Sequence, residues 1–347
     1  MQFLADYGLF LAKLVTVIAG LLVLIASIFA LSQRKHKESE GHIEVKDLGA
    51  RFEGFEDDIK HSILYDDELK ALHKEQRKKE KLEEKQRKKD KKHEHAKKRI
   101  FVLDFDGDMK ASAVENLREE ISAILTLSQA GEQVLVRLES SGGMVHSYGL
   151  AASQLQRLVN GGLELIIAVD RVAASGGYMM ACIGKQIIAA PFAIIGSIGV
   201  MAQLPNVNRL LKKHDVDIEL HTAGEFKRTL TVFGENTEKG RTKFLEELEE
   251  THTLFKQFVA QHRPQLDIGS VATGEVWYGT QAVENKLIDT VKTSDEFLME
   301  HRKDNDLFLV RYVEKKPWQE KLGMAAEASV ERVLMRWFNQ LSQRFFW

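Results

Sequence analysis

A short apolar run followed by a serine and two glycines constrains the fold of this chain most. Residues 165–169 have the sequence Leu-Ile-Ile-Ala-Val, and a short uncharged run rich in β-branched residues is typical of a strand buried on both faces. Ser175 and two glycines follow, and the apolar stretch 178–183 after them suits a buried helix. Ser175 is therefore predicted to lie at a strand-to-helix turn, near the first free N–H groups of that helix.

Strand and helix patterns alternate from Ile100 onward. The predicted strands and the helices between them are 100–105, 111–129, 133–138, 145–159 and 165–169. This is a repeated βαβ pattern, for which right-handed crossovers and a mostly parallel sheet are expected. Because active groups in such sheets gather at the carboxyl ends of strands, the Gly142-Gly143 turn and the Ser175 turn are expected to face the same crevice.

The second half of the folded region contains weaker signals. The apolar stretch 187–202 is long enough to raise the possibility of a second membrane span, but Pro191 and its glycines favour two short buried strands. Further elements are predicted as a strand at 217–222, a long amphipathic helix at 237–262 and a short helix at 280–285.

Two roles are open for Ser175 from its local sequence. A serine before a helix commonly caps the helix N-terminus, and a serine at such a turn can also be a nucleophile. A nucleophilic serine needs a base. None of the twelve histidines has an obviously site-like setting, and three near the predicted elements are interpreted as surface or cap residues: His146, His214 and His221. A lysine can serve as base if burial lowers its pKa, and Lys227 follows a glycine-containing loop.

An acyl-transfer intermediate also needs donors for its oxyanion. The N–H group of Gly176, directly after Ser175, is one candidate, and the Gly142-Gly143 turn offers the second. The alternative interpretation of Lys227 is an ordinary solvated loop residue, which is the commoner role of lysine.

The N-terminus carries a long apolar segment. Residues 14–31 are uncharged and almost wholly apolar, which predicts a membrane-spanning helix. A cleaved signal peptide is less well supported, because its apolar core is shorter and follows a basic start, whereas Asp6 precedes this one. Arg34, Lys35 and Lys37 follow the segment, and by the positive-inside rule they favour a cytoplasmic location for the rest of the chain.

A highly charged segment follows the anchor. Residues 70–99 contain fifteen Lys/Arg and six Asp/Glu, although the whole chain has a formal net charge of only −2. The segment is interpreted as a spacer, either a solvated helix or a disordered tether. Nucleic-acid binding is not expected, because aromatic residues are absent and acidic residues are interleaved. Contact with anionic lipid head groups is the better alternative if the segment is cytoplasmic.

The cysteine content excludes a disulfide framework. Cys182 is the one cysteine of the chain, and its apolar neighbours predict a buried packing role. The C-terminal segment 317–347 is amphipathic and rich in aromatic residues. It is predicted to lie on a membrane surface, to pack on a neighbouring subunit or to dock on its own domain, and the sequence leaves these three open.

Four motifs in a fixed order resemble one protein family. Gly142-Gly143 after a strand, 174–178 around Ser175, 224–227 ending in Lys227, and 274–279 match the signal peptide peptidase A family over about 100–291. The N-terminal anchor and the charged segment make the chain most similar to the SohB branch. The resemblance implies a serine endopeptidase on a Clp-protease/crotonase-like α/β fold, without a cofactor or a metal.

The resemblance also implies roles for particular residues. Ser175 is expected to be the nucleophile and Lys227 the general base, and the turn at Gly142 and Gly143 is expected to line the oxyanion hole together with Gly176. Family members often have Asn-Ser-Pro-Gly-Gly where this chain has Glu-Ser-Ser-Gly-Gly at 139–143. The missing proline leaves open which glycine donates. The chain has one copy of the catalytic βαβ unit, and short members complete the dyad either within a protomer or with a neighbour.

Domain boundaries, partners and location follow from these interpretations. The expected parts are an anchor at 1–33, a charged linker at 34–99, a protease domain at 100–300 and an amphipathic extension at 301–347. The resemblance implies peptide or unfolded-protein substrates, such as remnant signal peptides, a homo-oligomeric ring and the bacterial inner membrane. It favours a periplasmic domain slightly, in conflict with the basic flank. The alternatives are a crotonase-like acyl-CoA enzyme, a non-enzymatic membrane scaffold and a Ser-His protease.

Overall fold

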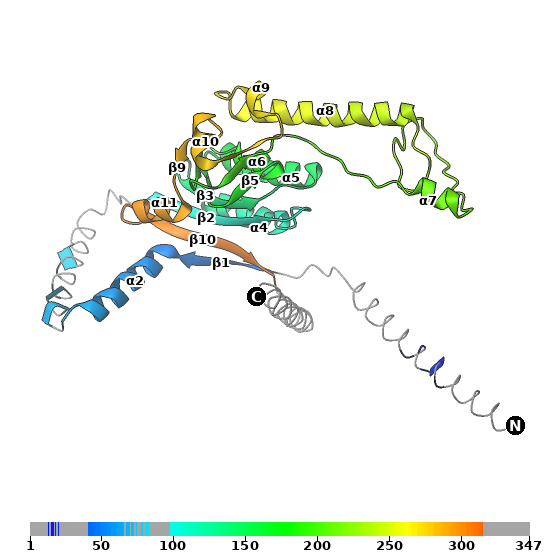
Figure 1. The fold of residues 1–347 in the computed structure, drawn as a ribbon. Coiled ribbons are helices and arrows are strands. Elements are labelled where there is room, and N and C mark those ends of the chain that lie inside the picture. Colours follow the sequence, from blue (N-terminus) through cyan, green and yellow to red (C-terminus); the bar gives the residue numbers. More distant parts are fainter. Residues whose placement is uncertain are drawn as a thin grey trace, which may run out of the picture. The chain divides into compact units, whose positions relative to one another are not determined.

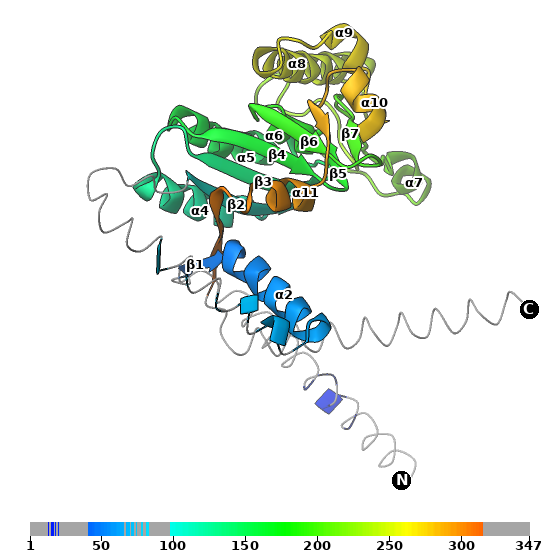
Figure 2. The same cartoon turned by 90° about the vertical axis from the view of Figure 1, so that its left-hand side faces the viewer.

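Ten strands in the described part of the chain form one sheet (Figures 1 and 2). The computed structural model describes residues 41–65 and 98–314, together with isolated positions within 13–20 and 67–82. Most of the predicted anchor at 14–31 and of the charged segment 70–99, and all of 317–347, lie outside the described residues. Among the residues that are described, no helix combines the length and the apolar composition that a membrane span requires.

The elements alternate along the chain as a βαβ pattern requires. The strands are β1 His42–Asp47, β2 Lys98–Gly107, β3 Gln133–Ser140, β4 Glu164–Val169, β5 Val172–Ala174, β6 Gln186–Ala189, β7 Ile194–Gly196, β8 Val276–Tyr278, β9 Thr290–Val291 and β10 Asn305–Val313. The helices are α2 Leu48–Ile63, α4 Val114–Leu127, α5 Val145–Asn160, α6 Gly176–Ala181, α7 Asn208–Lys213, α8 Glu238–His262, α9 Ile268–Val271, α10 Gly279–Glu284 and α11 Ser294–His301.

The centre of the sheet is parallel, as predicted. The strand order is β1-β10-β2-β3-β4-β6-β9, and the pairs β10–β2, β2–β3, β3–β4, β4–β6 and β6–β9 are all parallel. The short strand β5 pairs with the end of β3 and with β7, and β8 lies antiparallel to β7. This extension carries the Ser175 turn, because β5 ends directly before it.

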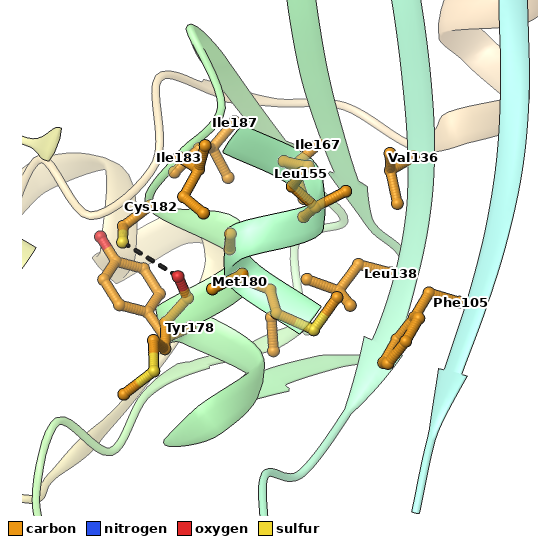
Figure 3. Close-up of a cluster of buried hydrophobic side chains, with 14 of the residues drawn as sticks. Phe105, Val136, Leu138, Leu155, Ile167, Tyr178, Met180, Cys182, Ile183 and Ile187 are labelled. Carbon is orange, nitrogen blue, oxygen red and sulfur yellow. Dashed lines mark hydrogen bonds between the residues drawn. The ribbon is translucent and has the colours of Figure 1, made fainter. Parts of the chain in front are cut away.

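Both faces of the sheet are buried, which confirms the interpretation of the apolar run at 165–169. In β4, Leu165, Ile167 and Val169 join the larger apolar cluster with α4, α5 and α6. The alternate residues Ile166 and Ala168 join a second cluster with side chains of α2 and α11. This division follows from the two-residue period of a strand. Figure 3 shows the larger cluster around α6.

The stretch 187–202 forms two short buried strands and not a membrane span. β6 and β7 lie on either side of Pro191, and Ile187, Ile188 and Ile195 are buried. The long helix predicted at 237–262 is α8, and the side chain of Thr237 caps it by accepting a hydrogen bond from the N–H of Gly240 at 3.1 Å.

The prediction of a strand at 217–222 is wrong. These residues have no regular secondary structure, and the whole stretch is exposed. The alternation of Val216, Ile218 and Leu220 with polar residues suggested a strand, but a strand also needs a partner. The loop between α7 and α8 leaves the sheet, so in one chain no partner is within reach.

One buried carboxyl group makes the stability of this domain depend on pH. Glu120 of α4 is only 6% exposed, and its carboxylate accepts a hydrogen bond from the N–H of Tyr312 at 2.9 Å. Burial is the main cause that raises the pKa of Glu120 from 4.5 to about 7, and nearby Asp104 raises it further, whereas the Tyr312 hydrogen bond and Arg311 lower it. The folded chain therefore keeps a proton that the unfolded chain releases.

We expect Glu120→Gln to flatten the pH dependence of stability. In the parent, the contribution of Glu120 to the free energy of unfolding is complete below pH 4.5 and is lost as the pH rises through about 7. The difference amounts to up to about 3 kcal/mol. Glutamine cannot ionise, and its carbonyl can still accept from Tyr312. Urea unfolding at pH 5 and at pH 8 measures the difference. The neighbouring exposed residue gives the control, Glu119→Gln, and equal pH dependence in all three proteins would contradict the assignment.

Candidate active site

Ser175 lies at the turn between β5 and α6, as the sequence predicts. Its backbone has φ 52° and ψ −117°, a left-handed region that costs a non-glycine residue on the order of 1–3 kcal/mol. Hydrogen bonds hold the turn on both sides. The Ser175 N–H donates to the carbonyl of Gly196 at 2.8 Å, and its carbonyl accepts from the N–H of Met179 at 3.0 Å. Such strain is maintained only where the surroundings enforce it.

The hydroxyl of Ser175 does not cap the helix. Ser175 occupies the N-cap position of α6, but its side chain accepts no hydrogen bond from the first turn. Within the described part of the chain the hydroxyl has no hydrogen-bond partner, and it lines a pocket. The capping interpretation is therefore wrong, and the hydroxyl is available for chemistry.

The two glycine turns meet, as expected from the parallel sheet. β3 and β5 pair through Ser140 and Ala173, so the residues after each strand lie side by side. A Cβ atom added to Gly142 would lie 2.8 Å from the Gly176 nitrogen and 2.8 Å from the Ser175 Cβ. Gly142 also has φ +90°, so only glycine fits this turn without strain.

The hydrogen bonds distinguish among the three candidate donors. The N–H of Gly142 donates to the hydroxyl oxygen of Ser140 at 3.0 Å and is therefore occupied. In the described part of the chain, the N–H groups of Gly143 and Gly176 make no hydrogen bond. Both glycines line the pocket beside Ser175. The arrangement offers two unoccupied backbone donors next to one unoccupied hydroxyl.

The pocket beside Ser175 is small and mostly apolar. It has a volume of about 20 Å³, and side chains from α5, α6, α8 and the segment after β7 line it: Val145, Met179, Val200, Thr251 and Phe255. No histidine of the same chain lines it. The contribution of α8 was not foreseen, because amphipathic spacing shows that a helix packs but does not identify its neighbour.

Lys227 does not lie beside Ser175 within one chain. It is exposed in the loop before α8 and does not line the pocket. Its neighbours hold it near the start of α8, since Glu225 forms an ion pair with Lys239 and the Lys243 ammonium lies 5.7 Å from the centre of the Phe226 ring. Thr251 of the pocket follows Lys239 by twelve residues, or about 18 Å along a helix.

Figure 1 agrees with this separation. The elements β5 and α6, which flank Ser175, lie toward the α9 end of α8, whereas α7 lies beyond the opposite end of α8. In the described part of the chain, Lys227 has no ion pair and no side-chain hydrogen bond, so nothing holds its ammonium group in place. No cluster of His, Cys, Asp and Glu that could hold a metal ion occurs among the described residues.

Two residues that the sequence analysis did not single out support the glycine turn. The hydroxyls of Ser140 and Tyr148 are 2.5 Å apart, and Tyr148 donates to the carbonyl of Asp108 at 2.8 Å. Both residues are buried, with exposures of 2% and 0%. Tyr148 is five residues beyond Gly143 on α5, and only its helical position inside the apolar core could have indicated this contact.

The match to sequence models of known families decides the family. Residues 2–155 match "Peptidase family S49 N-terminal", and residues 158–307 match "Peptidase family S49". The chain belongs to peptidase family S49. The resemblance inferred from the four motifs is thereby confirmed, and so is its SohB branch, because S49 relatives with that name are similar to this chain over almost their whole length.

Two such S49 relatives are named probable protease SohB. The protein of Haemophilus influenzae is 50% identical and covers 99% of both chains. That of Buchnera aphidicola subsp. Acyrthosiphon pisum is 46% identical over 97% of this chain and 98% of its own. A solved structure of a membrane-bound stomatin-specific protease, a mutant in complex with a substrate peptide, is 13% identical. It covers 65% of this chain and 96% of its own at a TM-score of 0.41.

Proposed function

We propose that this chain is a membrane-anchored serine endopeptidase in which Ser175 attacks the peptide bond. The observation that carries the proposal is the meeting of an unoccupied hydroxyl with the two unoccupied N–H groups of Gly143 and Gly176. Membership of a peptidase family supports peptide hydrolysis over the acyl-CoA alternative. The mostly apolar lining of the pocket favours an apolar side chain next to the cleaved bond.

The chemistry requires a base that the single chain does not bring to Ser175. We assign this role to Lys227 of a neighbouring copy. As Oγ of Ser175 bonds to the substrate carbonyl carbon, its proton passes to the neutral amine of that lysine. The oxyanion accepts hydrogen bonds from Gly143 and Gly176. The ammonium then protonates the leaving amine, which leaves an acyl-enzyme, and water attacks this ester in the second half by the same proton transfers.

The loop that carries Lys227 has the character of an interface. This loop and the segment before α7 expose apolar side chains that one chain leaves uncovered, at 53% for Leu220 and 87% for Met201. Others are Val216, Ile218, Phe226 and Phe233. Exposed apolar patches of this kind mark association sites. A head-to-tail contact between identical chains gives a ring when the rotation that relates them closes. Burial in that contact would dehydrate the lysine as a base requires.

The remaining parts of the proposal concern the ends of the chain. We assign 1–33 to a helix that anchors the enzyme in the bacterial inner membrane, 34–99 to a charged linker, 100–300 to a Clp-protease/crotonase-like domain and 301–347 to the C-terminal extension. The parallel sheet and its βαβ connections support the domain assignment. The apolar segment at 14–31 supports the anchor. By analogy with the family, the domain faces the periplasm.

Covalent labelling tests the proposed function. A fluorophosphonate probe reacts with activated serines, and we expect it to label the purified full-length protein in detergent at Ser175. Peptide mapping by mass spectrometry identifies the modified residue, and cleavage of an unstructured protein such as casein measures turnover. Labelling at another serine, or cleavage without any labelled Ser175, would contradict the assignment.

A further inference from the structure

We propose that Tyr148 is a positioning residue that fixes the two oxyanion donors relative to each other. This inference rests on the proposed function, because it assigns a task to the scaffold of the same site. Gly143 and Gly176 come from turns after different strands, β3 and β5. A pair of donors on separate turns needs a common support, since a misplacement of about 1 Å can cost on the order of a hundredfold in rate.

The ring of Tyr148 supports the Gly176 side. A Cβ atom added to Gly176 would lie 2.4 Å from Cγ and 2.7 Å from Cδ2 of Tyr148. The ring therefore packs directly against the backbone of the residue after the nucleophile. Tyr148 is fully buried in α5, so the ring cannot retreat from this contact without displacing the core.

The hydroxyl of Tyr148 supports the other turn through Ser140. Because Tyr148 donates its proton to the carbonyl of Asp108, the short contact with Ser140 requires Ser140 to be the donor there. The other acceptor near the Ser140 hydroxyl, the carbonyl of Gly107, is farther away at 3.4 Å. The Ser140 oxygen in turn accepts from the N–H of Gly142. The chain of hydrogen bonds thus runs from Gly142 to Ser140, then to Tyr148 and to Asp108. Bonds aligned in one direction polarise and strengthen one another.

The same hydroxyl also holds the loop against which Gly143 packs. A Cβ atom on Gly143 would lie 2.2 Å from the carbonyl oxygen of Met109, and that carbonyl accepts from the N–H of Met144 at 2.9 Å. Met109 follows the residue to which Tyr148 donates. Tyr148 therefore touches Gly176 with its ring and holds both sides of Gly143 with its hydroxyl. Burial raises the pKa of Tyr148, so the hydroxyl keeps the proton that it donates.

Ser140 also explains how the turn is stabilised without a proline. The stretch 139–143 has serine at 141, where family members often have proline. The hydrogen bond from the Gly142 N–H to Ser140 closes the turn through a side chain, as serine does in many turns. Because this bond occupies the N–H of Gly142, the N–H of Gly143 is the one left to donate to the oxyanion.

A second buried tyrosine provides a matched control. Tyr178 is also fully buried, and its hydroxyl donates to the carbonyl of Leu287 at 2.8 Å. Tyr178 belongs to α6, but the carbonyl that its hydroxyl contacts, that of Leu287, belongs to neither glycine turn. Tyr148→Phe and Tyr178→Phe each remove one buried hydroxyl that donates to a carbonyl, so both should lose stability. Tyr148→Phe should lose somewhat more, because Ser140 also loses its acceptor.

Steady-state kinetics of the full-length protein separate positioning from stability. We expect Tyr148→Phe to lower kcat by about 10- to 100-fold with KM changed less than about twofold, because the donors act mainly in the transition state. The inhibition constant of a peptide boronate, which forms a tetrahedral adduct with serine, should rise by a similar factor. Tyr178→Phe should also lower the melting temperature but keep the parent kcat.

The serine variant completes the test. Ser140→Ala should lower kcat to a similar extent, and the double variant with Tyr148→Phe should lose little more, because the two hydroxyls act in one chain of bonds. Parent kcat in Tyr148→Phe, or an equal loss of kcat in Tyr178→Phe, would overturn the inference. A parent protein that neither cleaves peptides nor binds the boronate contradicts the proposed function itself, and the inference falls with it.

Discussion

Ser175→Ala is expected to lower kcat by about 10⁴- to 10⁶-fold, because removal of a nucleophile leaves only the contribution of the oxyanion hole and substrate binding. The hydroxyl of Ser175 makes no hydrogen bond in the described part of the chain. Its loss therefore removes no contact that stabilises the fold. Substrate affinity, measured with a non-cleavable peptide, should stay close to that of the parent.

The control for this substitution must reproduce its backbone effect. Ser197 has φ 51°, almost the same as the φ of 52° at Ser175, and its N–H is held by the carbonyl of Glu275 at 2.6 Å. Ser197→Ala therefore places alanine in the same left-handed region. Turnover should persist in Ser197→Ala and disappear in Ser175→Ala, with similar melting temperatures. Appreciable turnover in Ser175→Ala would contradict the nucleophile assignment.

Lys227→Ala is expected to abolish turnover nearly as completely as the loss of the serine, since members of a cooperating pair have non-additive effects. Lys227→Arg is the more informative variant. Arginine keeps the positive charge and much of the length, but it cannot give up its proton in a protein and so cannot act as a base. Both variants should remain folded, because Lys227 is exposed. Cleavage of a fluorogenic peptide measures the loss.

A second lysine of the same loop region controls for charge. Lys213 ends α7, is exposed and forms no ion pair in the described part of the chain. Lys213→Ala removes the same charge from the same region and should keep the parent rate. If Lys227→Arg keeps near-parent turnover, the base assignment is wrong.

The sheet and the meeting of the glycine turns could be predicted from the sequence. Uncharged β-branched runs such as 165–169 identify the central strands. The rule that carboxyl ends of parallel strands meet at one edge then brings Gly142 and Gly176 together. Both steps depend only on local pattern and on a general property of parallel sheets. The amphipathic spacing at 237–262 likewise predicted α8 to within one residue of its observed start.

The hydrogen bonds that hold the glycine turn in place could not be predicted in this way. The contacts of Tyr148 join α5, the end of β3 and the loop after β2, and no local pattern specifies such a combination. The strand predicted at 217–222 failed because alternation describes one face of a strand but does not provide its partner. For the same reason, the position of Lys227 could not be predicted, because its loop leaves the sheet whose geometry guided the rest.

The central claim is that the serine and the lysine of one active site come from different chains. Co-expression of Ser175→Ala with Lys227→Ala, followed by purification of the mixed assembly through two different tags, tests it most directly. Each variant alone is inactive. In a randomly mixed head-to-tail ring, about a quarter of the sites combine an intact serine with an intact lysine. We therefore predict that the mixed assembly recovers about a quarter of the parent activity, whereas a mixed assembly without activity would contradict the account.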